Sequence, residues 1–309
     1  MEAYDAIRRD NRRSFLRRVM LTLALLLVVG VPLLFYAVRR FERAATFYPV
    51  AFDGGPSWRL PRGAEDVWIR TRGGVRLHGW LVKTRGVAPA ATVVYFHGNG
   101  GNLSYVGWLA EELAGRGFDV LLFDYKGYGR SEGTTLHERS LYEDADAVYE
   151  YLTAEQGQPP DRLVLYGQSL GTAAVVDLAS RRPCGAVILE SGLSSASEMA
   201  ALLMPWAPRF LHRLGRNRLD TARKLARVDR PVLVAHGEHD DIIPVEQGRA
   251  LYEAAREPKR LLIVPRAGHN NLVATGGDAY LDQLAEFIRA SMGEGVSSTP
   301  EARREGSRT

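Results

Sequence analysis

Ser169 lies at the centre of a short run flanked by glycines, and its hydroxyl could act as a nucleophile. The run, which follows an apolar strand-like segment and precedes a helical pattern, reads Gly167-Gln168-Ser169-Leu170-Gly171. A nucleophile elbow requires this strand-to-helix setting, because the sharp turn exposes the serine while the glycines let strand and helix approach closely. The alternative is a helix cap, in which the Ser169 hydroxyl only accepts a backbone N–H.

His269 is the histidine best placed to take a proton from Ser169, whose hydroxyl is a poor nucleophile without a base. It lies in the run Gly268-His269-Asn270, on a loop just after the last apolar strand-like segment. Ser169 should lie at the same edge of the sheet. The other histidines have ordinary structural explanations. For example, His78 lies within an early strand, and His97 and His236 each precede a glycine at a strand end.

A carboxylate is needed to orient the histidine and to stabilise its charged form. Asp240 follows the penultimate strand-like segment and gives the chain order serine, aspartate, histidine. Its neighbour Asp241 is one alternative. Glu190, which follows an earlier strand, is another, although it could instead hold the loop that comes after it.

An oxyanion hole is the fourth requirement, because negative charge develops on the carbonyl oxygen during attack. A glycine-rich run after a strand could turn backbone N–H groups into the site; it reads His97-Gly98-Asn99-Gly100-Gly101-Asn102. We predict that the donors are the N–H groups of Asn99 and Leu170. The run has no lysine followed by serine or threonine, as a P-loop would, and its spacing differs from the dinucleotide-binding fingerprint.

The elements that must position these residues alternate between short apolar runs and longer helical patterns. Strands are predicted at residues 67–70, 75–82, 92–96, 120–123, 163–166, 186–189, 232–235 and 261–264. Helices are predicted at residues 105–116, 140–155, 170–181, 245–256 and 278–291. Strands that are apolar at every position suit a parallel sheet buried on both faces. The alternation predicts a doubly wound, mostly parallel α/β domain.

Residues 19–38 form an uncharged apolar run with the sequence VMLTLALLLVVGVPLLFYAV. As a helix the run would be about 30 Å long, which matches the hydrocarbon core of a bilayer. Arg39 and Arg40 follow it, where a signal peptide would have small residues before its cleavage site. We therefore predict an uncleaved transmembrane anchor, with a cleaved secretory signal as the alternative.

The positive charge of the chain is concentrated beside this apolar run. The formal net charge is +4, and residues 1–18 alone hold six arginines against Glu2, Asp5 and Asp10. Basic residues in such positions orient a membrane span, and they give no support for nucleic-acid binding. Because fewer arginines follow the run than precede it, we predict a cytoplasmic amino terminus and a catalytic domain on the opposite side.

The sequence thus divides into five predicted regions. They are a basic arm (1–18), the anchor (19–38), a connector (39–61), the α/β domain (62–291) and a disordered tail (292–309). Within the domain, residues 191–227 are too many for a simple crossover and predict a small cap. The single cysteine, Cys184, excludes an intramolecular disulfide, and no histidine is evident that would make it a nucleophile.

Taken together, these elements resemble the α/β-hydrolase superfamily over about residues 45–291. More narrowly, the chain is similar to membrane-anchored, single-domain hydrolases that include lysophospholipid lipases and protein depalmitoylases. The residues that carry this closer resemblance are Phe47-Tyr48-Pro49, His97-Gly98-Asn99, Asp124 to Ser131, Gly167 to Gly171, His236 to Pro244 and Gly268-His269-Asn270. Gly100 departs from the pattern, since alanine is common there in relatives, but the backbone donors remain available.

The resemblance implies a triad of Ser169, Asp240 and His269 that hydrolyses acyl esters or thioesters through an acyl-enzyme. It implies a structural role for residues 124–131 and requires no metal or organic cofactor. Proximity to a bilayer would suit lipid or lipidated substrates. A serine peptidase or amidase uses the same triad, and a non-catalytic scaffold could keep the same fold, so both are alternatives.

Overall fold

The structure, a computed structural model, describes residues 2–55, 58–86, 88–135, 137–213 and 215–293. The chain separates into two compact units, Met1–Thr46 and Phe47–Thr309. The second unit, called the catalytic unit below, therefore begins at Phe47, earlier than the predicted domain start at residue 62. Of the predicted tail, residues 294–309 lie outside the described part of the chain.

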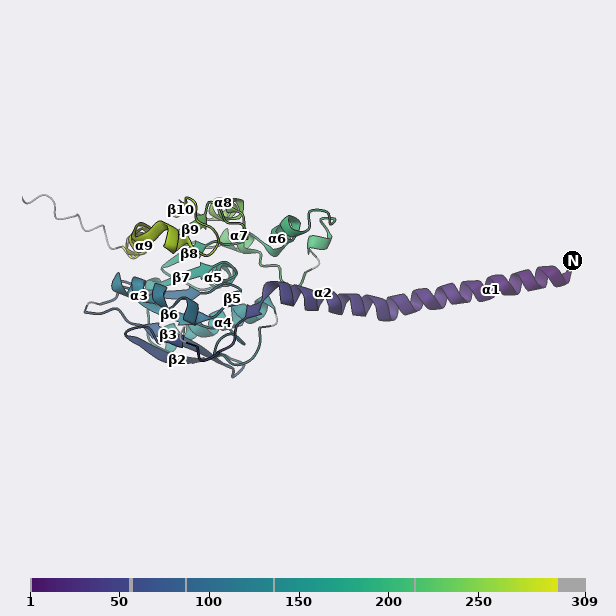
Figure 1. Cartoon of the computed structure of the whole chain (residues 1–309), viewed down its shortest axis with the longest axis horizontal. Helices are drawn as coiled ribbons and strands as arrows, with labels where there is room; N and C mark the ends of the chain where they lie inside the picture. Colours follow the sequence, from purple (N-terminus) through teal and green to yellow (C-terminus); the bar gives the residue numbers. More distant parts are fainter. Residues whose placement is uncertain (1, 56–57, 87, 136, 214, 294–309) are drawn as a thin grey trace, which may run out of the picture. The chain divides into compact units, whose positions relative to one another are not determined.

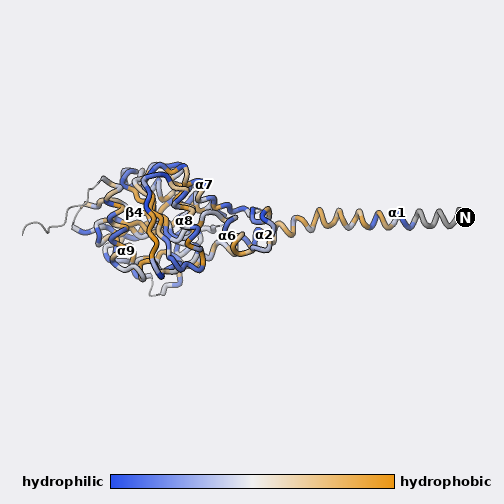
Figure 2. The backbone as a smooth tube through the Cα atoms, turned by 90° about the horizontal axis from the view of Figure 1, so that it is seen from above, coloured by the Kyte–Doolittle hydropathy of each residue, from blue (hydrophilic) through white to orange (hydrophobic). Residues whose placement is uncertain are grey.

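The first unit is helical from Glu2 to Thr46. It consists of α1 (Glu2–Leu25), a π-helical turn η1 (Leu26–Gly30) and α2 (Val31–Thr46). By length and composition, one stretch of the described residues, Asn11–Thr46, could cross a membrane, a criterion that a signal sequence would also meet. Figure 2 shows its apolar part in orange. The helix continues through residues 39–46, which the sequence analysis places in the connector.

The catalytic unit is built on an eight-stranded sheet with the strand order β10-β9-β8-β7-β4-β6-β3-β2. The strands are β2 (Ala64–Arg70), β3 (Arg76–Val82), β4 (Thr92–Phe96), β6 (Asp119–Phe123), β7 (Leu163–Gln168), β8 (Ala186–Glu190), β9 (Val232–Gly237) and β10 (Lys259–Val264). β3 runs antiparallel to both of its neighbours, β2 and β6, and the other neighbouring strands of this sheet pair in parallel. Buried on both faces, the central strands are apolar throughout, as Figure 2 shows for β4.

Helices cover both faces of this sheet. They are α3 (Gly107–Gly115), α4 (Glu138–Glu150), α5 (Gly171–Ala179), α6 (Ala196–Leu203), α7 (Thr221–Leu225), α8 (Val245–Ala254) and α9 (Leu272–Ser291). One buried cluster joins the sheet to α4, α5, α7 and α8, and a second joins its other face to α3 and α9. Figures 1 and 2 show α9 across the sheet from α7 and α8.

This architecture confirms the predicted fold class, a doubly wound and mostly parallel α/β domain. Every predicted strand and helix has a counterpart, with bounds that differ by a few residues. The predicted helix at 278–291 is the second part of α9, because Gly277 interrupts that helix with a φ of 56°. The predicted cap contains α6, a short 3-10 helix η6 (Leu211–Arg213) and α7.

One small sheet was not predicted from the sequence. In the predicted connector, β1 (Tyr48–Pro49) pairs in parallel with β5 (Gly100–Gly101), inside the glycine-rich run. A bridge between Ala51 and Gly129 continues this association. The residues that follow the first unit are thus part of the catalytic unit and lie against the predicted oxyanion loop.

Candidate active site

The predicted site residues gather at the carboxyl edge of the sheet. Ser169 directly follows β7, while Asp240 and His269 lie on the loops after β9 and β10. The loop that contains Asn99 follows β4, the neighbour of β7. Between β4 and β7 the chain changes its direction of travel across the sheet, since β6 lies on the far side of β4. Ligands of open α/β sheets bind at such switch points.

Ser169 sits on a strained turn. Its φ is 54°, in the left-handed region that non-glycine residues seldom adopt. The turn is held because the Ser169 N–H donates to the Glu190 carbonyl at 2.8 Å and the Thr172 hydroxyl donates to the Ser169 carbonyl at 2.6 Å. Only glycine fits two residues later, because a Cβ on Gly171 would lie 2.0 Å from the Phe96 carbonyl oxygen. These features are those of a nucleophile elbow.

The side chains of Ser169, His269 and Asp240 form one hydrogen-bonded chain. The distance from Ser169 Oγ to His269 Nε2 is 3.0 Å, and that from His269 Nδ1 to Asp240 Oδ2 is 2.7 Å. All three residues are buried, with at most 8% of their surface exposed. The structure thus brings together three residues that are separated by up to a hundred positions in the sequence.

Asp240 is held as a carboxylate. Its Oδ1 accepts hydrogen bonds from the Ile242 and Ile243 N–H groups at 3.0 and 2.8 Å. Burial disfavours the charge, but bonds from His236, His269 and Ile243 outweigh it and lower the pKa of Asp240 below its usual value. A carboxylate only accepts, so His269 Nδ1 carries the proton. In the neutral form of His269, the lone pair on Nε2 then faces the Ser169 hydroxyl.

The two alternative acids lie elsewhere. Asp241 is exposed and has no described contact with His269. The Glu190 carboxylate accepts hydrogen bonds from the Tyr166 and Tyr280 hydroxyl groups, the latter at 2.5 Å. Burial raises the pKa of Glu190, although both tyrosines oppose this shift. Neither acid is bonded to His269, and the Glu190 side chain binds tyrosines of the sheet and α9, not the cap loop.

The two backbone groups predicted as oxyanion donors are unoccupied. Among the described contacts, the N–H groups of Asn99 and Leu170 donate no hydrogen bond. That of Leu170 lies at the start of α5, where the first N–H groups of a helix lack internal acceptors. The loop after β4 lies close by, because a Cβ on Gly98 would be 3.4 Å from that of Ser169.

The loop that carries Asn99 is fixed from its far side. The Asn99 carbonyl accepts one hydrogen bond from the Tyr48 N–H and one from the Tyr128 hydroxyl, both at 2.9 Å. The Tyr125 hydroxyl donates to the His97 carbonyl at 3.1 Å. Because the carbonyl of Asn99 is held, the orientation of the loop at this residue is fixed before any substrate binds.

Beneath this loop lies a buried pair of ionisable residues. His97 Nε2 is 3.6 Å from Asp124 Oδ1, which also accepts a hydrogen bond from the Leu103 N–H at 2.7 Å. Burial lowers the pKa of His97 to about 4 and raises that of Asp124 to about 8. Near neutral pH both groups are therefore mainly uncharged, so the loop packs against an uncharged His97–Asp124 pair.

Several residues that support the site were not predicted from the sequence. His236 Nε2 lies 3.2 Å from Asp240 Oδ2 and 2.8 Å from the Ile243 carbonyl. The Ser191 hydroxyl donates to the His269 carbonyl at 3.0 Å, and Gln168 Nε2 donates to Asn270 Oδ1 at 3.2 Å. The sequence offers only one signal for these roles, which is that the residues lie near site residues along the chain, because each contact joins separate loops.

Other reactive side chains have structural surroundings. Cys184 is fully buried, and burial raises the pKa of its thiol to about 12, so its reactive thiolate is scarce. His78 Nε2 is bonded to Asp66 Oδ1 at 2.7 Å. No group of three or more histidine, cysteine, aspartate or glutamate side chains within the described part of the chain could hold a metal ion.

Comparisons with known proteins place this chain in a family. Residues 87–224 match the family described as serine aminopeptidase, S33. The uncharacterized protein Rv2307c of Mycobacterium tuberculosis is 38% identical over 251 residues, which cover 80% of this chain and 87% of that protein. The uncharacterized protein YfhR of Escherichia coli is 33% identical over 271 residues, which cover 83% and 90%.

A relative whose name states its fold and a solved structure point the same way. The mouse alpha/beta hydrolase domain-containing protein 17C is 36% identical over 204 residues, 65% of this chain and 61% of that protein. The Pyrococcus furiosus esterase Pf2001 superposes with a TM-score of 0.64 at 19% identity, over 80% of this chain and 99% of the esterase chain. The chain described here belongs to the α/β-hydrolase superfamily.

Proposed function

We propose that this protein is a membrane-anchored serine hydrolase that cleaves acyl esters or thioesters. The observation that carries the proposal is the hydrogen-bonded chain from Ser169 through His269 to Asp240, which starts at a strained elbow. Membership of a hydrolase superfamily supports the reaction class, and the esterase among the structural neighbours agrees with it.

In the proposed reaction, Ser169 Oγ attacks the acyl carbonyl carbon while His269 Nε2 takes the hydroxyl proton. Asp240 keeps the His269 ring oriented and stabilises its positive charge. The N–H groups of Asn99 and Leu170 stabilise the oxyanion. His269 then protonates the leaving alcohol or thiol, which leaves an acyl-serine. Water, activated by the same histidine, releases the carboxylic acid and restores Ser169.

The helix Asn11–Thr46 supports the anchored part of the proposal. It is long and apolar enough to span a bilayer, and the catalytic unit follows it directly at Phe47. Substrates with acyl chains are concentrated in membranes, so an enzyme tethered there meets lipid or lipidated substrates first. The closer resemblance to lysophospholipid lipases and protein depalmitoylases supports the same substrate class.

Labelling with a fluorophosphonate probe tests the nucleophile. We expect the purified full-length chain to be labelled and Ser169→Ala to be unlabelled, because the probe reacts with a serine activated by a neighbouring base. Ser180→Ala is a matched control, since this serine follows the far end of α5 and its hydroxyl donates to the Asp177 carbonyl. Labelling that persists in Ser169→Ala, or is absent from the wild type, would favour a non-catalytic scaffold.

A substrate series then tests the reaction class. We expect hydrolysis of p-nitrophenyl esters to become more efficient as the acyl chain lengthens, and lysophospholipids or acyl-thioester peptides to be cleaved as well. A preference for acetate esters over all longer chains would contradict the lipid part of the proposal and leave the nucleophile intact.

Amide hydrolysis is a second candidate, because the matching family is described as serine aminopeptidase. The same triad cleaves amides, so the site geometry does not separate the two reactions. Matched p-nitroanilide and p-nitrophenyl substrates with the same acyl group distinguish them. We expect kcat/KM to be much larger for the ester, and a comparable value for aminoacyl anilides would favour the peptidase.

A further inference from the structure

The cap displays large apolar side chains that no other part of the described chain covers. The cap is defined here as residues 196–218, which contain α6, a turn and η6. In Figure 1 it projects from the catalytic unit at the end away from α9. Its most exposed apolar side chains are Leu202 (48%), Leu203 (74%), Trp206 (80%) and Phe210 (67%). Clusters of this kind mark a surface that binds something else.

The same segment is strongly basic. Residues 196–218 contain four arginines and one acidic residue, Glu198. The arginines, all exposed, are Arg209, Arg213, Arg216 and Arg218. None of their guanidinium groups forms an ion pair among the described contacts. The cap therefore combines exposed aromatic and aliphatic side chains with arginines that form no ion pair among the described contacts.

The cap is a folded element and not a loose loop. His212 Nε2 donates to the Met204 carbonyl at 3.1 Å, which closes the turn after α6. At its base, the Ala196 N–H donates to the Arg218 carbonyl at 2.9 Å. The inner side of α6 packs on the core through Ala196 and Met199. Because these contacts hold the base of the cap, the exposed apolar side chains belong to a folded element.

Hydrogen bonds also fasten the carboxyl end of the cap to the body of the catalytic unit. The Glu138 carboxylate, at the start of α4, accepts hydrogen bonds from the N–H groups of Arg218 and Leu219 at 3.0 and 2.6 Å. The Asn217 side chain in turn accepts one from the Glu138 N–H at 2.7 Å. These bonds hold the basic end of the cap in place with its charged side chains outward.

We propose that the cap is a membrane-docking surface that binds the headgroup region of a bilayer containing anionic lipids. Tryptophan, phenylalanine and leucine beside arginine are typical of segments that lie in this interface. The four unpaired arginines complement anionic headgroups. Proximity comes from the chain itself, since the catalytic unit begins at Phe47, eight residues after the end of the predicted anchor at residue 38.

Docking in this way would bring the active-site edge of the sheet to the bilayer. The cap follows β8, and β8 pairs with β7, whose carboxyl end carries Ser169. A membrane-bound cap would therefore present the site to molecules that reside in the interface. This inference adds a second membrane contact to the proposed hydrolase and does not depend on which bond is cleaved.

A fluorophore at position 206 tests the inference in the full-length protein. Trp206→Cys is labelled with an environment-sensitive nitrobenzoxadiazole dye and reconstituted into vesicles of phosphatidylcholine alone or mixed with phosphatidylglycerol. The buried Cys184 should remain unlabelled under native conditions, which the wild type verifies. Gln156→Cys, exposed at the opposite edge of the sheet before β7, is the matched control.

In the mixed vesicles we expect a blue-shifted emission at position 206 that is quenched by lipids with a shallow nitroxide, and neither effect at position 156. Replacement of Arg209, Arg213 and Arg216 by Gln should weaken the docking about a hundredfold, since each basic residue near an anionic surface contributes about fivefold. This variant should still hydrolyse a soluble p-nitrophenyl ester, which shows that it is folded.

Two results would overturn the inference. One is an emission at position 206 that matches that at position 156 in both kinds of vesicle. The other is a blue shift that appears in detergent without lipid and grows with protein concentration, which would assign the surface to a second copy of the chain. Because fluorescence needs no turnover, either result is distinguishable from a failure of the proposed hydrolysis.

Discussion

At the scale of single residues, Asp240 differs sharply from its neighbour Asp241. Asp240 is bonded to His269 and to two backbone N–H groups, whereas Asp241 is exposed. In Asp240→Asn, the amide group could donate to His269 Nδ1 and leave the proton on the wrong ring nitrogen. We expect kcat to fall by about 10³- to 10⁴-fold. Steady-state kinetics on a p-nitrophenyl ester measures this, and Asp241→Asn should keep nearly full activity; the reverse pattern would assign the acid to Asp241.

Asp124 should impose a pH dependence on stability. Its pKa of about 8 in the folded protein lies above the ordinary value of 3.8. Between these values the folded state holds a proton that the unfolded state releases. The contribution of Asp124 is thus complete below the ordinary value and is lost as the pH rises to about 8, at up to about 1.4 kcal/mol per pH unit.

Asp124→Asn cannot titrate and should lack this decline. Its amide oxygen can still accept the hydrogen bond from the Leu103 N–H. Chemical unfolding in detergent between about pH 5 and pH 8 compares the two proteins, and the other ionisable groups contribute equally to both. Identical slopes would show that the Asp124 carboxyl is already ionised in the folded state.

The sequence predicted which residues would meet in the site but not what holds them. Ser169, Asp240 and His269 could be selected because each follows a strand, and parallel strands end at one edge. The contacts of His236 with Asp240 and of Tyr128 with the Asn99 carbonyl depend on how separate loops pack. No local pattern encodes such packing. The catalytic roles of the three residues stay a prediction until the variants are measured.

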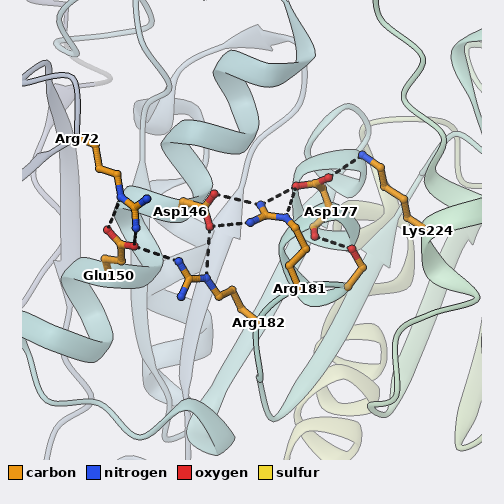
Figure 3. A network of polar contacts seen from close by, with 8 residues as sticks. Arg72, Asp146, Glu150, Asp177, Arg181, Arg182 and Lys224 are labelled. Atoms are coloured by element: carbon orange, nitrogen blue, oxygen red, sulfur yellow. Dashed lines mark hydrogen bonds and ion pairs between the residues drawn. The ribbon is translucent and has the colours of Figure 1, made fainter.

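At the scale of elements, a network of ion pairs joins three helices on one face of the sheet (Figure 3). Asp177 on α5 accepts hydrogen bonds from Lys224 Nζ on α7 at 2.6 Å and from Arg181 Nη2 at 2.7 Å. Arg181 also pairs with Asp146 on α4 at 3.1 Å. The Asp177 side chain is nearly buried, so this carboxylate is screened less than the exposed pairs.

We expect Asp177→Ala to lower the free energy of unfolding by about 1–3 kcal/mol, because three charge-assisted hydrogen bonds, one from Lys224 and two from Arg181, are lost. Chemical denaturation measures the change. Arg139→Ala is the control, since Arg139 is 80% exposed and pairs only with Glu143 of the next helical turn. That pair should contribute less than about 0.5 kcal/mol. Equal effects of both substitutions would mean that burial of Asp177 adds nothing.

The sheet and its helices were predictable because their apolar periodicity is local. The exceptions were short or irregular. β1 and β5 have two residues each, and their pairing is defined only once distant segments meet. Within the segment 191–227, α6 and α7 have eight and five residues, too few for a clear period. The first part of α9 was not predicted, because Gly277, which has a positive φ, interrupts the helical pattern.

At the scale of the whole molecule, the anchor makes a separate prediction. We expect the full-length chain to remain in the membrane pellet after extraction with alkaline carbonate and to retain its amino terminus by mass spectrometry. A mature chain that begins after residue 38 would instead establish a cleaved signal.

The side of the membrane can be tested with thiol chemistry. An impermeant maleimide added to intact cells should modify Gln156→Cys in the catalytic unit and spare Asn11→Cys before the span. This expectation follows from the larger number of arginines before the apolar run than after it. Modification of Asn11→Cys alone would place the catalytic unit in the cytoplasm.

The pairing of β1 with β5 also has a mechanical consequence. The chain enters the catalytic unit through the buried Phe47 side chain and through Tyr48 and Pro49, which pair with Gly100 and Gly101. A force that pulls on the amino-terminal helix would therefore load the packing of Phe47 and this two-residue pair first. The Tyr48 N–H that would yield is bonded to the carbonyl of Asn99. Tension on the tether would thus act on the proposed oxyanion loop as soon as it reached the catalytic unit.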